Sequence, residues 1–434
     1  MAVDEPAQAE KGARPGETRL QVSRPVIGRR SLCGRSPAKE EKIAYLEFLI
    51  GALIVAGVLY DVFQTVVVPR WTSRTLRLQP FLIEALWSMW GRAGRRVQTA
   101  QRREDFLGTF APLALMLVLL AWVLALIFGY GLMIHALGKQ IRPRAPDLGD
   151  AVYLAGSSVL TLGFGDFVAV GGLARFVVLA AGASGLAVVA LVISLTFTLY
   201  GQFQRREVLV LTLDARAGAP PSGVTMLETY AKLALLEELP ATFAAWEIWS
   251  AEMLESHIAY PILPYFRSSH KNESWVSALG AVLDAATLLL TAVDVGPNAA
   301  DGMPSVRRPQ GAAELMYRLG CHALLDLSNW FRFHLPATPE ATGDTELARA
   351  AGVERSEFMA ARQRLAAAGY HLCDEEAAWR SFVKYRAVYA AALNTLAHRF
   401  GTPSTQWIGG RSTPTDPHHR EGASPPASRV GKGI

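Results

Sequence analysis

Three long apolar runs dominate the first half of the chain, and polar or basic segments separate them. The runs cover residues 43–68, 106–137 and 172–201. At about 1.5 Å per residue, each run is long enough to cross the ~30 Å hydrocarbon core of a bilayer as a helix. Hydrophobic residues make up 51% of the 434 positions. Because the excess is concentrated in these runs, the pattern predicts a multi-pass membrane protein whose first partner is the lipid bilayer.

The second half of the chain, residues 222–400, has apolar residues at helical spacing between short Pro- and Gly-containing breaks. No strand-like alternation occurs there, so we expect an all-α fold with a helical C-terminal domain. Its tryptophans at helical spacing are expected to pack in a core. The expected helices are 223–239, 241–258, 273–293, 311–334, 354–368 and 374–399, and the tryptophans are Trp246, Trp249, Trp275, Trp330 and Trp379.

The two ends, residues 1–42 and 401–434, lack apolar periodicity and are rich in residues that disfavour packing, so we expect disordered tails. No apolar segment lies near Met1, which argues against a cleaved signal peptide. The start codon could also lie downstream of Met1.

Basic residues crowd the flanks of the apolar runs. The segment 69–105 is rich in arginine, and the formal net charge of the chain is +5. The positive-inside rule accounts for this balance, and no nucleic-acid-binding motif is present, so we expect no nucleic-acid partner. Within the segment, residues 81–90 are too short to span and predict an interfacial helix on the cytoplasmic surface, with Trp87 and Trp90 dipping into the lipid.

A short semi-apolar stretch, residues 148–160, lies between the second and third runs. It predicts a helix of three to four turns with Asp147 as its N-cap. Directly after it comes the hexapeptide Thr161, Leu162, Gly163, Phe164, Gly165 and Asp166. The preceding helix would point the negative end of its dipole toward this segment.

The hexapeptide has the residue types that a cation site made of backbone oxygens requires. A cation that crosses a bilayer must exchange its water shell for other oxygens, and consecutive carbonyls can supply them if the backbone alternates between left- and right-handed conformations. Gly163 and Gly165 adopt positive φ without a Cβ penalty. We therefore expect an ion-binding ladder of carbonyls from Thr161, Leu162, Gly163 and Phe164, with Asp166 attracting cations at the mouth.

The stretch 150–166 resembles the pore loop of the tetrameric potassium channels, which usually ends TTVGYGD. Leu160 replaces the first Thr, Leu162 replaces Val, and Phe164 replaces Tyr, which removes a hydroxyl that normally hydrogen-bonds behind the filter. Ser157 stands where some members carry a carboxylate that braces the filter. The resemblance covers residues 106–206, with an outer helix at 106–137, a pore helix at 148–160, a filter at 161–166 and an inner helix at 172–201.

The resemblance implies a homotetramer that conducts K⁺ passively across the plasma membrane, with no cofactor and no enzymatic activity. K⁺ would bind at Thr161, Leu162, Gly163 and Phe164. The filter would open outward, which makes the segment 69–105 and the domain 222–400 cytoplasmic. One extra span at 43–68 then places Met1 outside, against the basic tail; either the tail is translocated, or residues 81–97 enter the membrane more deeply.

Several assignments keep two interpretations. Gly185, with Gly182 near it, is a hinge where the inner helix bends to gate, or a site of close helix packing. Asp61 lies inside an apolar run, where a carboxylate can be functional; pairing with Arg70 or Arg74 near the interface is favoured. Neither the three cysteines nor the scattered histidines have the spacing of a metal site, and no nucleophile–base arrangement of an enzyme is evident.

Two rival functions remain beside the potassium channel. The altered filter motivates a weakly selective cation channel. The large domain 222–400 motivates a membrane-anchored sensor or scaffold with a nonconducting pore. That domain could regulate opening, aid assembly, or bind an unknown ligand or protein.

Overall fold

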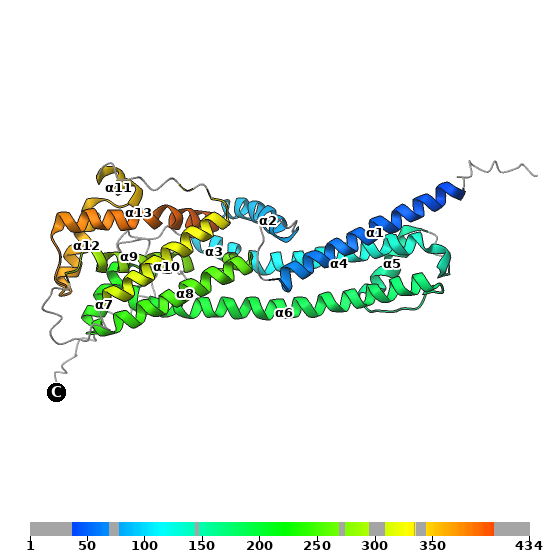
Figure 1. The fold of residues 1–434 in the computed structure, drawn as a ribbon, viewed down its shortest axis with the longest axis horizontal. Coiled ribbons are helices and arrows are strands. Elements are labelled where there is room, and N and C mark those ends of the chain that lie inside the picture. The colour runs from blue at the N-terminus through cyan, green and yellow to red at the C-terminus, as the bar shows by residue number, and fades with distance from the viewer. Residues whose placement is uncertain are drawn as a thin grey trace, which may run out of the picture.

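The structure is a computed structural model that describes residues 37–68, 78–143, 147–268, 274–294, 309–333, 335 and 344–402. Over these residues the chain is helical apart from one two-residue ribbon and an isolated bridge, so the expected all-α class is confirmed. Most of the two expected tails lies outside the described residues. In Figure 1 the membrane-type helices lie at one end of the molecule and the C-terminal domain at the other.

Three helices are long and apolar enough to cross a membrane among the residues that the structure describes. They cover most of the three predicted runs: α1 (Pro37–Val66), α4 (Phe110–Ala136) and α6 (Gly172–Ala217). The first begins inside the stretch expected to be a tail, because Glu40, Glu41 and Lys42 are good helix formers that extend the apolar segment.

Helix α1 packs antiparallel against α4. At the crossing, Gly51 and Gly129 let the backbones approach so closely that a Cβ on Gly51 would lie 2.5 Å from the carbonyl oxygen of Gly129. Near one end of α1, Glu47 Oε2 lies 2.9 Å from His135 Nδ1.

The intramembrane carboxylate of Asp61 is also part of this α1–α4 contact. It is 2% exposed and accepts a hydrogen bond from Trp122 Nε1 at 2.8 Å. The expected partners Arg70 and Arg74 lie outside the described residues. The carboxylate therefore joins two helices, which the sequence could not indicate because Trp122 lies 61 positions away.

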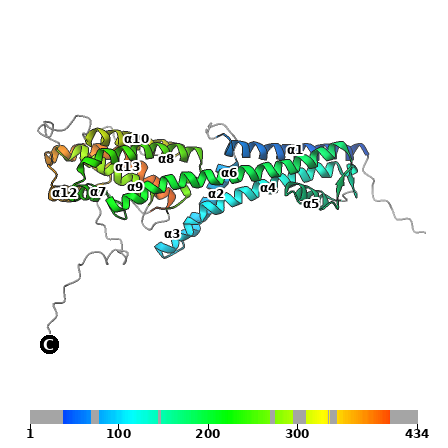
Figure 2. The same cartoon turned by 90° about the horizontal axis from the view of Figure 1, so that it is seen from below.

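Helix α6 connects the two parts of the molecule without a break (Figures 1 and 2). Its 46 residues continue to Ala217, past the expected end at 201, and span roughly 69 Å at about 1.5 Å per residue. The apolar run ends near Gly201, but Val210, Leu213 and Ala217 keep one face buried beyond it. The helix continues because that amphipathic segment packs into the C-terminal domain.

The C-terminal domain is a helical bundle built around α9 (Trp275–Thr291), in which every side chain except that of Leu290 is buried. A helix that is apolar all round belongs in the centre of a core. The surrounding helices are α7 (Gly223–Lys232), α8 (Leu239–Ala259), α10 (Pro309–Trp330), α11 (Asp344–Ala351), α12 (Arg355–Ala367) and α13 (Glu375–Phe400), with 3₁₀ turns η2 (Leu236–Glu238) and η3 (Leu263–Tyr265).

The tryptophans of this domain serve its core, as expected, at four positions: Trp246, Trp249, Trp275 and Trp379 are buried, and Trp330 is half-buried. The largest differences from the expected helices are one early end and one additional helix. The first expected helix ends at Lys232, and α11 was not foreseen because its eight residues have too few apolar positions to show a period.

The arginine-rich segment docks onto the protein, so the expected lipid contact of Trp87 is wrong. Helices α2 (Leu78–Gly94) and α3 (Ala100–Gly108) lie between the two ends of the molecule (Figure 1). Trp87 packs against Tyr265 at a centroid distance of 4.9 Å and donates from Nε1 to the carbonyl of Arg399 at 3.1 Å. Trp90 stacks on Phe106 at 4.6 Å. The partners of Trp87 lie far along the sequence, where no local pattern reveals them.

Ion pairs strengthen the same contact. Glu104 of α3 pairs with Arg267, and Glu84 of α2 lies 3.5 Å from Arg399. The C-terminal domain thus contacts both the segment that precedes the N-terminal end of α4 and the C-terminal half of α6.

Candidate functional site

A short helix, α5 (Leu148–Val159), delivers the chain to the glycine-rich segment. Asp147 caps it as expected, with Oδ1 accepting from the backbone N–H of Asp150 at 2.9 Å. Its buried side chains pack against α4 and α6. The helix therefore stands on a fixed support, and its C-terminal carbonyls point toward the residues that follow.

Those carbonyls hold the start of the next segment. The carbonyl of Ser157 accepts from the N–H of Leu162 at 2.7 Å and of Gly163 at 3.4 Å, and the carbonyl of Ser158 accepts from Thr161 at 3.0 Å. Because these amides are bound to the end of α5, the loop backbone is placed by the helix that precedes it.

The backbone of this segment alternates in handedness. Thr161, Gly163 and Gly165 have φ of +57°, +62° and +82°, and Leu162 and Phe164 between them are not in the left-handed region. Such an alternation brings successive carbonyl oxygens to one side of the chain. Positive φ at Gly163 and Gly165 was expected.

Thr161 was not expected to adopt positive φ. A residue with a Cβ in the left-handed region costs about 1–2 kcal/mol, and strain of this kind concentrates at functional sites. The alternating spacing 161, 163, 165 was the signal that could have predicted it.

Aromatic rings stand beside the outer part of the segment. Tyr153 of α5 stacks on Phe164 with 6.2 Å between centroids and 7° between planes, and meets Phe167 edge-on. The Asp166 carboxylate accepts from the backbone N–H of Phe167 at 3.1 Å. Ser157 does not brace the segment through its hydroxyl, which donates to the carbonyl of Leu154 at 3.0 Å.

The segment lies open on the surface of the chain. All residues from 160 to 166 are exposed, including Leu162 at 55% and Phe164 at 64%. A Cβ on Gly163 or Gly165 would meet no atom within 4 Å. Exposed apolar side chains gathered in one place mark a surface that contacts protein, lipid or a ligand.

A small ribbon holds the outer side of the loop. Strands β1 (Ile141–Arg142) and β2 (Val168–Ala169) pair antiparallel, with Ile141 opposite Ala169. Gln140 adds two contacts: its carbonyl accepts from Val170 at 2.9 Å, and its side chain accepts from Ala174 at the start of α6 at 3.2 Å.

Gly185 is the closest contact between α6 and α5. A Cβ there would lie 1.8 Å from the carbonyl oxygen of Val159, whereas a Cβ on Gly182 would lie 3.4 Å from that of Ser158. At the adjacent position, Tyr130 of α4 shares a 2.7 Å hydrogen bond with Ser184. This geometry favours the packing interpretation of Gly185; a hinge at Gly182 or Gly185 stays a prediction.

Farther along α6, Arg206 anchors the helix in the C-terminal domain. Its guanidinium is buried and donates to the carbonyls of Leu263 at 3.2 Å and Phe266 at 2.6 Å. It also lies beside Glu207 and His257. Burial, with the charge of Arg206, holds the pKa of His257 well below its usual range, so this imidazole is neutral.

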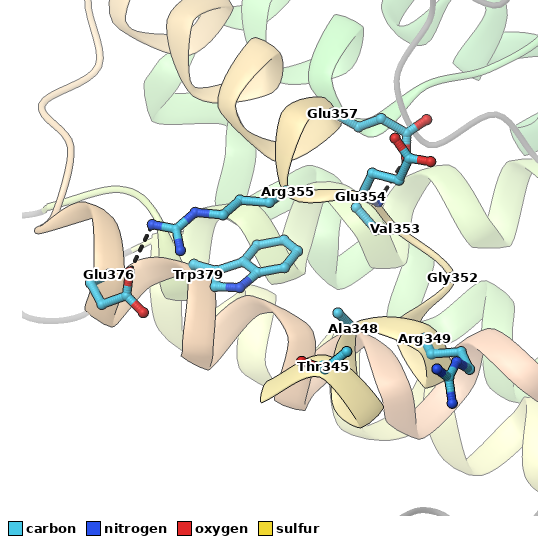
Figure 3. Close-up of a pocket in the computed structure, with 10 residues that line it drawn as sticks. All are labelled: Thr345, Ala348, Arg349, Gly352, Val353, Glu354, Arg355, Glu357, Glu376 and Trp379. Carbon is cyan, nitrogen blue, oxygen red and sulfur yellow. Dashed lines mark hydrogen bonds and ion pairs between the residues drawn. The ribbon is translucent and has the colours of Figure 1, made fainter. Parts of the chain in front are cut away.

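The C-terminal domain also has an open cavity of about 660 Å³ between α11, α12 and α13 (Figure 3). Its charged groups largely satisfy one another. Arg355 pairs with Glu376 at 2.7 Å, and Glu354 and Glu357 form the capping box of α12. The lining therefore favours no particular ligand chemistry. Over the described ranges, no group of three or more His, Cys, Asp or Glu residues could hold a metal ion.

The comparisons agree with the geometry of the membrane part. Residues 114–202 match a family model described as an ion channel, from α4 through α5 and the glycine-rich loop to the middle of α6. This segment is therefore an ion-channel domain, carried in a chain with three membrane-type helices. Searches among curated proteins and solved structures found no match to the chain.

Proposed function

We propose that this chain is the subunit of a homotetrameric potassium channel whose selectivity filter is Thr161 to Asp166. The observation that carries the proposal is the alternating backbone at Thr161, Gly163 and Gly165, held by the end of α5. K⁺ would be bound by the carbonyls of Thr161, Leu162, Gly163 and Phe164, with Asp166 at the mouth.

A tetramer follows from the incompleteness of one chain. One loop supplies only one wall, and the exposed side chains of Leu162 and Phe164 need cover. Four copies around an axis close the ring of carbonyls with a common point-group symmetry.

The same proposal sets the topology. The filter opens toward the outside of the plasma membrane, and the C-terminal domain lies in the cytoplasm. The docking of α2 and α3 on that domain supports a common side for both, as the positive-inside rule requires of the arginine-rich segment.

The C-terminal domain regulates opening. It holds α6 through Arg206 and the base of the α4 region through Trp87 and Glu104. A movement of the inner helix relative to the outer helix must therefore move or strain this domain, which gives a bound ligand or partner a route to the pore.

The test is ion flux through the purified full chain in liposomes. Wild type, Gly163→Ala and Gly57→Ala are compared under K⁺ and Na⁺ gradients. Gly163 has positive φ, so alanine distorts the carbonyl ladder, whereas a Cβ on the α1 residue Gly57 meets nothing within 4 Å and serves as the matched control.

We expect K⁺ flux well above Na⁺ flux in wild type and Gly57→Ala, and its loss in Gly163→Ala. Equal flux of both ions would indicate a weakly selective cation channel, attributable to Leu162 and Phe164. Absence of flux in all three proteins, under conditions that unlock a gate, would favour the nonconducting sensor or scaffold.

A further inference from the structure

Helix α6 has two faces that differ along its whole length. One face is buried against its own chain, at positions from Ala174 through Val192 and Leu199 to Leu213 and Ala217. The opposite face is exposed along the same length. Within the membrane part it carries Leu186, Val189, Ile193 and Phe197, the last at 76% exposure.

The exposed face becomes apolar again beyond the membrane part. Val208 and Leu211 are 62% and 43% exposed, and Ala215 is exposed one turn further. Two exposed apolar side chains are ordinary on a soluble surface. Val208 and Leu211 differ from ordinary exposed residues because they continue the exposed apolar face of the membrane part of α6.

The helical repeat aligns these residues with the exposed membrane face. Ile193 and Leu211 are 18 positions apart, as are Ala190 and Val208, and Phe197 and Ala215. At about 3.6 residues per turn, 18 residues make roughly five full turns, so each pair lies on one line along the helix. Because α6 is unbroken from Gly172 to Ala217, this alignment is maintained across the membrane boundary.

The geometry points to a contact between copies of this chain along α6 beyond the membrane, made by Val208, Leu211 and Ala215. This inference rests on the proposed tetramer, whose filter is incomplete without partner copies, and it extends the subunit interface into the C-terminal domain. The occupant is a second copy because the surface continues the exposed face of α6 in the membrane part, which the proposed tetramer would cover.

The anchoring of Arg206 keeps this face in place. Its guanidinium is bound to the carbonyls of Leu263 and Phe266, which fixes the rotation of α6 within the domain. The buried neighbours Val210 and Leu213 hold the other side. The domain thus holds the exposed strip of α6, made of Val208, Leu211 and Ala215, in one fixed orientation.

Thiol crosslinking of the full chain in membranes tests the inference. The background carries Cys33→Ser, Cys321→Ala and Cys373→Ser, and must retain ion flux. Single variants Leu211→Cys and Leu315→Cys are then compared. Leu315 is a matched exposed leucine (53%) on α10, which packs on α8 and α9. Phe197→Cys reports the contact within the membrane part.

With a short bifunctional thiol reagent, each chain carries one cysteine, so we expect a covalent dimer for Leu211→Cys and for Phe197→Cys and only monomer for Leu315→Cys. A dimer for Phe197→Cys without one for Leu211→Cys would overturn the inference and leave the tetrameric pore standing. No dimer at either position, together with a monomeric native mass, would overturn the proposed channel as well.

A second variant avoids any effect of an introduced cysteine. Val208→Glu combined with Leu211→Glu places charges on side chains exposed in the single chain, so helix content should be unchanged. We expect the tetramer to dissociate at lower detergent concentration than wild type. Unchanged tetramer stability would contradict a contact at this strip.

Discussion

The guanidinium of Arg206 and the imidazole of His257 meet inside the C-terminal domain, with Nη1 3.3 Å from Nε2. A guanidinium can only donate, so Nε2 accepts and the ring proton resides on Nδ1, which faces Ser256 Oγ at 3.2 Å. This contact joins α6, which packs against α5, to α8 of the C-terminal domain.

Replacing Arg206 should weaken the link between α6 and the domain. In Arg206→Met the carbonyls of Leu263 and Phe266 lose their donors, and we expect a loss of about 3 kcal/mol in the free energy of unfolding. Chemical unfolding of the full chain in detergent measures it. Arg205→Met, at the exposed neighbouring position, is the control and should be near wild type. Equal effects of the two variants would contradict the anchoring role of Arg206.

Stability of the domain should fall on acidification because of His257. Its pKa in the folded protein is lowered by burial and by Arg206, against about 6.5 in the unfolded chain. Below about pH 6.5 the unfolded state binds a proton that the folded state does not, so stability is complete above that pH and decreases below it, by up to about 1.4 kcal/mol per pH unit.

Thermal unfolding of the full chain between pH 7.5 and 5.5 measures this dependence. In His257→Gln the slope near pH 6 should become shallower, because glutamine can accept from Arg206 without titrating. An unchanged slope would assign the acid sensitivity to other groups.

Gly185→Ala should disrupt the pore, and Gly182→Ala should be tolerated. The added Cβ lies 1.8 Å from the carbonyl oxygen of Val159 in the first case and 3.4 Å from that of Ser158 in the second. We expect a marked loss of tetramer and flux only for Gly185→Ala. If Gly182→Ala abolishes gating while the tetramer persists, the result supports a hinge at Gly182, because loss of helix packing would also dissociate the tetramer.

The Asp61–Trp122 hydrogen bond should stabilise the α1–α4 contact. Trp122→Phe leaves the buried carboxylate without its indole donor, at a cost of about 1–3 kcal/mol. Asp61→Asn keeps an acceptor oxygen and should cost less than Trp122→Phe. Resistance of α1 to proteolytic release in detergent is the measurement; identical resistance in all three proteins would show that the bond contributes little.

Local patterns predicted the parts of this fold that local chemistry determines. The three membrane-type helices follow from uninterrupted apolar runs, and positive φ at Gly163 and Gly165 follows from their lack of a Cβ. Asp147 as a cap needs only the residues beside it.

Features that depend on distant partners were not predictable. Trp87 fits an interfacial helix until Tyr265 and the carbonyl of Arg399 are seen to contact it. The extension of α6 to Ala217 depends on the core that covers Val210 and Leu213. Left-handed backbone at Thr161 is different, because its amide contacts Ser158 only three residues away and the alternating spacing 161, 163, 165 could have indicated it.

The pairing of Asp61 with Trp122 also constrains the order in which α1 and α4 insert into the membrane during synthesis. Helix α1 emerges from the ribosome before α4 has been made, so the indole donor does not yet exist when α1 reaches the membrane. A carboxylate inside the bilayer is costly, and this donor lowers the cost only after α4 is present. Nascent α1 should therefore wait at the insertion machinery, or near the headgroups, until α4 arrives, and the two helices should leave for the bilayer together.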